Sequence, residues 1–229
     1  MMGQPIATFS FDEWLAFVFD HPVAGQQREW YWEPEADWWD GPPGLTLEYL
    51  TRAFENAAAL FEPYSDGQLN QGLWYLASNA CSDHMAALLD EGVPWPQRQR
   101  CLRSMSALYA QCFAPRCLPA LGHLDEQPTN PLNAVCYMWW DILPVYGRPD
   151  LPERQALDQA CLQVMAAALA LPSEACQESA LHGLGHWAIY YPEPVAAIVN
   201  AYLAGSPMPR TPREPLRLYA LAARRGMVL

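Results

Sequence analysis

The helical spacing of apolar residues is the feature that most limits the fold of this chain. Between residues 101 and 113, apolar side chains recur three or four positions apart: Cys101, Leu102, Met105, Leu108, Tyr109, Cys112 and Phe113. That spacing places them on one face of an α-helix. Similar stripes recur along the chain, whereas the alternation typical of strands is nearly absent. The sequence therefore predicts an all-α fold of about ten helices joined by short, proline-rich turns.

Capping residues mark several expected helix starts. Residues 10–13, 65–68 and 211–214 each begin with Ser or Thr and end with Glu or Gln, the pattern of a capping box. Thr46 is expected to cap a helix that runs to about Phe61. Ser82 is expected to cap a short helix, with Asp83 favourably placed at its positive end. Another helix is expected over residues 192–203.

An internal echo relates two parts of the chain. Gly72-Leu73 precede the small-residue segment 85–89, and Gly183-Leu184 precede the segment 195–199 at a similar spacing. In this pattern residues 46–204 resemble HEAT-like helical-repeat proteins. The resemblance implies antiparallel helix pairs that stack, with alanine-rich inner faces that allow close approach. A single irregular helical bundle is the alternative architecture.

The length of 229 residues suits one large domain with a substantial core. We expect a single all-α domain over residues 1–229. Within it, residues 1–45 hold an N-terminal helix and an irregular segment rich in acids and tryptophans, and residues 46–229 hold the repeat-like stack.

Residues 29–40, here called the acidic aromatic segment, combine five carboxylates, four tryptophans and a tyrosine without a basic residue. So many carboxylates cannot be buried together without partners, whereas rings beside negative charge suit a docking site for a basic protein. Two groups of residues would form that site: the anchors Trp30, Trp32, Trp38 and Trp39, and the charged residues Glu29, Glu33, Glu35, Asp37 and Asp40. Alternatively, the rings cover one end of the stack beneath a rim of solvated acids, or exposed tryptophans stack on carbohydrate.

The negative charge is concentrated near the N-terminus. The formal net charge is −12; residues 1–66 hold 12 acids and 2 arginines, a net of −10, and residues 67–229 hold 13 acids and 11 arginines, a net of −2. Nucleic acid is a poor partner for such a surface, because its binding needs cationic side chains. A basic protein is a better partner, because opposite fields raise encounter rates.

His182 and His186 form the pattern that most resembles a catalytic site. Histidines four positions apart share a helix face and can bind one metal ion. Glu178 lies one turn earlier on that face, and His84, Asp83 or His123 are candidates for a more distant ligand. Gly183 follows His182, so the glutamate of a His-Glu-x-x-His metalloprotease motif is missing. The structural alternative is that Gly183 and Gly185 permit close helix contact while the histidines hydrogen-bond to backbone or tyrosine groups.

Two further clusters are interpreted chiefly as structural. Residues 81–84 bring together Cys, Ser, Asp and His, as a hydrolase would need, but adjacent side chains on a turn rarely face one another. Residues 137–141 are expected to pack in the core through Trp139. The alternative places Trp140 and Asp141 in a groove.

Location and redox state follow from composition. The seven cysteines are odd in number and fit no disulfide framework, and Cys101, Cys112, Cys136 and Cys161 fall on apolar stripes. Residues 1–7 lack the pattern of a signal peptide, and apolar runs are shorter than the roughly 20 residues of a membrane helix. We therefore expect reduced thiols, a cytoplasmic location and no membrane contact.

The favoured function is protein binding without a cofactor. Size and acidity resemble those of bacterial immunity or antitoxin proteins, which neutralise a basic toxin by blocking it. The first alternative is a metal-dependent enzyme, with zinc or iron held by His182 and His186 and completed by Glu178 or His84. The second alternative is a scaffold subunit in a larger assembly.

Overall fold

The computed structural model describes residues 3–23, 29–126, 130–205 and 212–228. Helices make up 64% of it, which confirms the all-α class. The α-helices are α1 Phe11–Phe19, α2 Pro43–Glu55, α3 Ala57–Leu60, α4 Asp66–Ala77, α5 Trp95–Leu108, α6 Ala114–Arg116, α7 Leu132–Ile142, α8 Gln155–Leu169, α9 Glu174–Trp187, α10 Pro192–Leu203 and α11 Glu214–Ala223. The shorter segments are β1 Pro5–Ile6, η1 Trp30–Trp32, β2 Trp38–Trp39, η2 Met85–Leu89, a π-helical turn η3 Tyr109–Phe113, η4 Gly122–Leu124 and η5 Pro152–Arg154.

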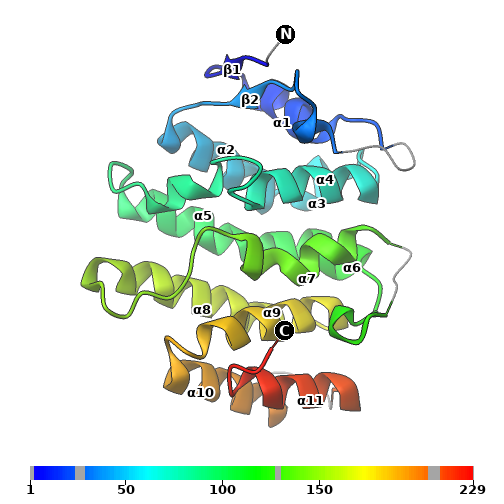
Figure 1. Ribbon diagram of the computed structural model, residues 1–229, viewed down its shortest axis with the longest axis vertical. Coiled ribbons are helices and arrows are strands. Elements are labelled where there is room, and N and C mark those ends of the chain that lie inside the picture. Colours follow the sequence, from blue (N-terminus) through cyan, green and yellow to red (C-terminus); the bar gives the residue numbers. More distant parts are fainter. Residues whose placement is uncertain (1–2, 24–28, 127–129, 206–211, 229) are drawn as a thin grey trace.

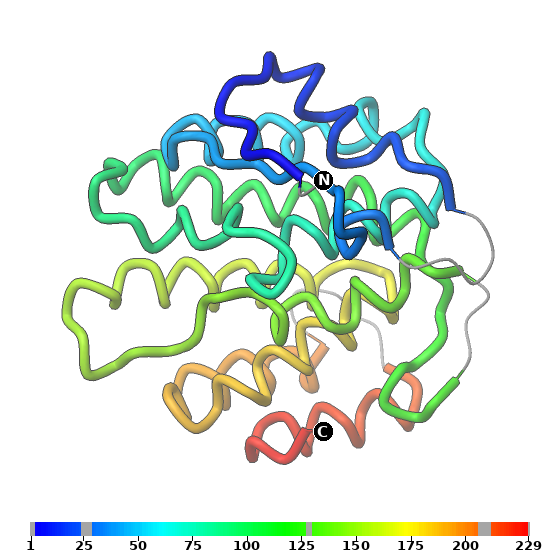
Figure 2. The backbone as a smooth tube through the Cα atoms, turned by 45° about the horizontal axis from the view of Figure 1, so that its top comes forward, coloured from blue at the N-terminus to red at the C-terminus, as the bar shows by residue number. Residues whose placement is uncertain are grey.

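The helices lie in two rows that run along one axis (Figures 1 and 2). In one row, α2 contacts α5, α5 contacts α8, and α8 contacts α10. In the other, α1 contacts α4, and the contacts continue through α7 and α9 to α11. The N-terminal strand and α1 lie at one end of the stack, and α10 and α11 at the other (Figure 1). Kinship with HEAT-like proteins stays a prediction.

Two of the expected capping boxes are present. At α1, Ser10 Oγ accepts a hydrogen bond from the Glu13 amide, and Glu13 Oε2 accepts one from the Ser10 amide at 2.7 Å. Ser65 and Gln68 exchange the same pair of bonds at α4. The helix over residues 192–203 is also confirmed. The third box begins at Thr211, which lies outside the described residues.

Two expected caps are wrong. Helix α2 begins at Pro43, so Thr46 lies inside it, where its hydroxyl accepts a hydrogen bond from the Trp39 indole at 2.8 Å. Ser82 caps no helix: its hydroxyl donates to the Tyr75 carbonyl at 2.6 Å and lies 2.8 Å from His84 Nδ1. The segment after it, η2, is 3-10 rather than α-helical. In both cases the hydroxyl that the local pattern assigns to a cap bonds instead to a residue seven positions earlier, Trp39 or Tyr75.

Helix α9 is buried on nearly every side, since it packs against α7, α8 and α11. Its approach to α7 depends on Gly183, because a Cβ there would lie 2.5 Å from Cγ of Trp140. Trp139 and Trp140 are both buried, which confirms the core-packing interpretation of residues 137–141 and contradicts a groove lined by Trp140. The tight contact brings the exposed end of α7, with Asp141, alongside α9.

The N-terminal layer, which comprises β1, α1, η1 and β2, is held on the helical stack by its aromatic residues. Strands β1 and β2 pair in parallel, with Pro5 opposite Trp38 and Ile6 opposite Trp39. The Trp39 amide donates to the Tyr75 hydroxyl of α4 at 3.3 Å.

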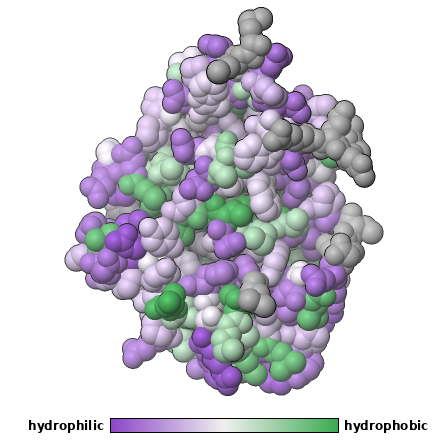
Figure 3. All heavy atoms as spheres, in the orientation of Figure 1, coloured by the Kyte–Doolittle hydropathy of each residue, from purple (hydrophilic) through white to green (hydrophobic). Residues whose placement is uncertain are grey.

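Each of the described helices is too short or too polar to cross a bilayer. Figure 3 shows apolar patches interrupted by polar side chains on the face it draws.

Candidate functional site

The acidic aromatic segment exposes two of its four tryptophans. Trp32 is 41% exposed and Trp38 is 46% exposed, although both are large rings. Trp32 closes the 3-10 turn η1, and Trp38 begins β2, where only its backbone pairs with β1. The faces of these two rings are therefore open to solvent.

The other two tryptophans are held by the protein itself, contrary to their expected role as anchors. Trp39 is 7% exposed, and its indole N–H donates to Thr46. Trp30 is half-buried, stacked on His21 with ring centroids 4.0 Å apart and tilted against Tyr75 at 4.6 Å. Their rings fix the segment on α1, α2 and α4, so its outer surface is held in place.

All five carboxylates of the segment are exposed: Glu29, Glu33, Glu35, Asp37 and Asp40. Asp37 Oδ1 accepts a hydrogen bond from the Gln4 amide at 2.7 Å, which ties the segment to the N-terminal strand. The outer surface is therefore negative, with two exposed indoles among the acids.

A pocket of about 330 Å³ lies where the segment meets η2. Trp38 and Trp39 both line it. Three carboxylates also line it: Asp40 from the segment, and Asp83 and Asp90 from either end of η2. No sequence pattern points to Asp90, because it lies 50 residues beyond Asp40 and nothing local links the two.

His182 and His186 lie side by side on α9, as their spacing predicts. Their Nε2 atoms are 3.2 Å apart, and Asp141 Oδ1 of α7 is 3.5 Å from His186 Nε2. The ligand atoms of these three residues all lie within 4.8 Å of one another. The sequence pattern groups Asp141 with residues 137–140 instead, since only the packing of α7 against α9 brings it to the histidines.

Neither Glu178 nor His84 completes the histidine pair. Glu178 is buried, and its two oxygens accept hydrogen bonds from the amides of Gly122 and His123, both at 3.0 Å. Glu178 Oε1 also lies 2.6 Å from His123 Nδ1. The carboxylate therefore anchors η4 to α9 and is already occupied.

His84 belongs to a different part of the fold. It is buried in the N-terminal layers, where its Nε2 accepts a hydrogen bond from the Trp14 indole at 3.0 Å. Burial lowers its pKa to about 3. With Nε2 accepting, Nδ1 carries the proton and donates to Ser82. Ser82 and His84 therefore face one another, contrary to the expectation for neighbouring side chains on a turn, and the expected cap is absent. Both ring nitrogens and the Ser82 hydroxyl are occupied by hydrogen bonds within the fold.

Tyr219 of α11 orients the histidine pair. Its hydroxyl lies 2.7 Å from His182 Nδ1, and its ring stacks on His123 with centroids 4.0 Å apart. Burial, together with the neighbouring His186, lowers the pKa of His182 to about 4. His182 is therefore a neutral imidazole near pH 7, with Nε2 facing His186.

The chain matches no protein-family model, no curated protein and no solved structure.

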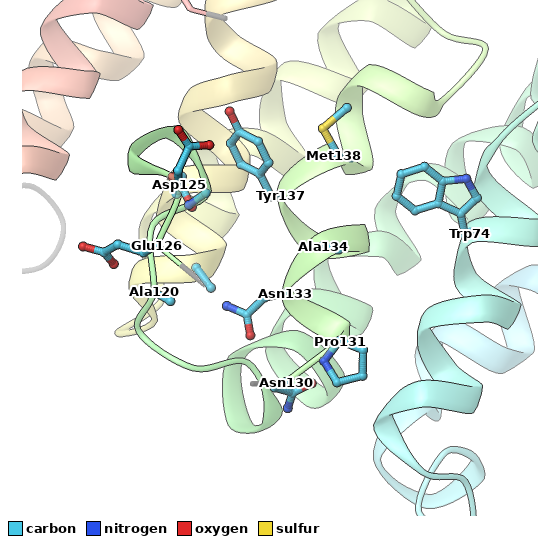
Figure 4. A pocket seen from close by; sticks show the side chains of 13 residues that line it. Trp74, Ala120, Asp125, Glu126, Asn130, Pro131, Asn133, Ala134, Tyr137 and Met138 are labelled. Atoms are coloured by element: carbon cyan, nitrogen blue, oxygen red, sulfur yellow. The ribbon is translucent and has the colours of Figure 1, made fainter. Parts of the chain in front are cut away.

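A second pocket, of about 340 Å³, lies between α4, α7 and the loop that holds Asp125 and Glu126 (Figure 4). Asp125 and Glu126 come from the loop on one side, and Trp74 of α4 lies across from them, beyond Tyr137 and Met138 of α7 (Figure 4). Tyr137 also contacts the ring of His182, with centroids 4.5 Å apart. Tyr137 thus separates the pocket from the histidines, and Asp141 follows one turn later on α7.

Proposed function

We propose that this protein binds a basic protein through the outer surface of its N-terminal layer, with Trp32 and Trp38 as anchors. The observation that carries the proposal is the pocket beside Trp38, which combines indole rings with Asp40, Asp83 and Asp90. An arginine or lysine side chain of the partner would fill it.

The chemistry of the pocket suits a cationic side chain. A guanidinium or ammonium group is attracted to the face of an indole ring. Carboxylates add charge-assisted hydrogen bonds, which are stronger than neutral ones. An anionic ligand would meet three carboxylates here, so the same geometry disfavours phosphate groups and nucleic acid.

The acidic aromatic segment is held in a fixed conformation, and this favours binding through its exposed tryptophans. The segment is held by Trp30 and Trp39, which are packed against α1, α2 and α4 residues. A surface held in its binding conformation loses less conformational entropy on association. Exposed rings on a fixed support are also the kind of residue that dominates binding energy at protein interfaces.

The acidic surface also suggests what kind of protein the partner is. An acidic protein that blocks a basic enzyme, as immunity and antitoxin proteins do, fits this surface; a scaffold subunit would use the same contacts. All seven cysteines are unpaired, which supports a reducing compartment such as the cytoplasm.

Trp38→Ala tests the proposal. The untagged protein is titrated with a fluorescent arginine-rich peptide, and basic proteins are co-purified from cells of the source organism. Truncating Trp38 should cost about 2 kcal/mol or more of binding free energy in the titration, and the basic proteins captured by wild type should be lost from the co-purification. If the captured partner is a toxic enzyme, co-expression with this protein should restore growth of the host cells. Unchanged growth would favour a scaffold role.

Leu218→Ala is the matched control. Leu218 is 53% exposed on α11, at the other end of the stack, so its truncation removes a similarly exposed apolar group. Equal binding by wild type and Trp38→Ala, with both proteins folded by circular dichroism, would refute the proposed docking surface.

A further inference from the structure

The end of α7 and the second half of α9 bring three metal-binding side chains to one place on the surface. His182 and His186 lie one helical turn apart, and Asp141 reaches them from the neighbouring helix. The side chains of Asp141 and His186 are 42% and 41% exposed, so the cluster opens to solvent. Neither the histidines nor Asp141 takes part in the proposed docking surface.

We propose that Asp141, His182 and His186 form a mononuclear zinc site with one coordination position open to solvent. Two ligand atoms bound to tetrahedral zinc at about 2.0–2.1 Å lie about 3.3 Å apart. The two Nε2 atoms are 3.2 Å apart, and Asp141 Oδ1 is 3.5 Å from His186 Nε2. These two distances already match the spacing that a shared ion requires.

The ligands are of the type that zinc takes. Two imidazole nitrogens and one carboxylate oxygen make up a three-residue set found in zinc sites with an open position, where water completes the coordination. The remaining distance, from Asp141 to His182, is at most 4.8 Å. A rotation of the exposed Asp141 side chain closes it, whereas buried His182 stays fixed.

The surrounding residues hold His182 in the orientation that a metal needs. A ligating histidine usually donates its other ring N–H to a neighbouring group, which fixes its tautomer and ring plane. Tyr219 Oη, 2.7 Å from His182 Nδ1, accepts that bond. The Tyr219 ring is itself held by stacking on His123, which Glu178 anchors. Glu178 thus acts as a positioning residue for the site rather than as a ligand.

Gly183 ties the site to the packing of the fold. The absence of a side chain there lets Trp140 approach α9, and Trp140 immediately precedes Asp141 on α7. The same contact that closes the core therefore sets the distance between Asp141 and the histidines.

The test is a titration of untagged protein, freed of metal by a chelator, with zinc chloride in a calorimeter. We expect one zinc per chain and a higher melting temperature with zinc. His186→Ala, at a partly exposed position, should abolish stoichiometric binding, and Asp141→Asn should weaken it strongly. Tyr219→Phe should lower the affinity about tenfold to a hundredfold, since it removes only the supporting hydroxyl.

Two controls separate this site from other zinc-binding groups. His21→Ala removes a histidine of the N-terminal layers and should leave zinc binding unchanged. Cys81→Ser/Cys117→Ser removes the two less buried thiols and should also leave it unchanged. Cobalt substitution should give the visible bands of a four-coordinate nitrogen and oxygen site without thiolate charge transfer. Absence of stoichiometric binding, or equal binding by His186→Ala, would overturn the proposal.

Discussion

His84 is a buried histidine, and its hydrogen bonds require the neutral form of the imidazole ring. Trp14 donates to Nε2, and Nδ1–H donates to Ser82, whose hydroxyl donates in turn to the Tyr75 carbonyl. No acceptor of the described residues is available to a second ring proton, so protonation would break the bond from Trp14. Burial removes water from the ring and so disfavours its charged form, which lowers the pKa of His84 to about 3.

The lowered pKa predicts acid destabilisation. The unfolded chain binds a proton at His84 below about pH 6.5, whereas the folded protein does not until about pH 3. The free energy of unfolding should therefore fall as the pH drops from about 6.5, by up to about 1.4 kcal/mol per pH unit from this group. Above about pH 6.5 this group contributes no pH dependence.

Urea unfolding of wild type and His84→Gln at pH 7 and pH 5 measures this contribution. The glutamine side-chain carbonyl of that variant can still accept the Trp14 bond, but the amide does not titrate. Wild type should lose about 2 kcal/mol more than the variant between the two pH values. His182 titrates in both proteins and cancels in the comparison. Equal losses would show that His84 is protonated without penalty in the folded state.

At the scale of elements, the contact between α7 and α9 depends on one missing side chain. A Cβ on Gly183 would lie 2.5 Å from Trp140 Cγ, closer than unbonded carbons approach. Gly183→Ala should therefore destabilise the protein by about 1–3 kcal/mol in thermal or urea unfolding, as overpacking does. It should do so although alanine is the better helix former.

Gly44→Ala in α2 is the matched control for Gly183→Ala. The nearest atoms to a Cβ there are on Gln97, 3.9 Å away, so alanine has room. It should leave stability unchanged or raise it by up to about 1 kcal/mol, because alanine restricts the unfolded chain more than glycine does. A gain in stability for Gly183→Ala as well would mean that α7 and α9 can move apart without cost.

Local sequence patterns predict well those features that depend on residues three or four positions apart. The Ser10 and Ser65 capping boxes, and the facing pair His182 and His186, follow from spacings of three or four residues. Such patterns do not predict side chains whose partners lie outside this three- or four-residue spacing. Thr46 binds Trp39 instead of capping a helix, and Asp141 joins the histidines only because α7 packs on α9.

At the scale of the whole molecule, charge is distributed unevenly along the stack. Residues 1–66 carry a net charge of −10 out of −12. The described residues of this range form the end of the stack that holds α1, β2 and α2 (Figure 2). A basic partner approaching from solution is therefore drawn to that end, where the exposed tryptophans also lie.

This asymmetry predicts that the position of a carboxylate, and not only its charge, sets the association rate. Glu33→Gln/Asp40→Asn removes two exposed charges from the N-terminal layer, and Glu153→Gln/Glu193→Gln removes two exposed charges from the other half. At low salt, the first variant should bind the arginine-rich peptide severalfold more slowly than the second in stopped-flow measurements. At about 1 M salt the Debye length falls to about 3 Å, so the two rates should converge. Equal rates at low salt would place the peptide elsewhere on the protein.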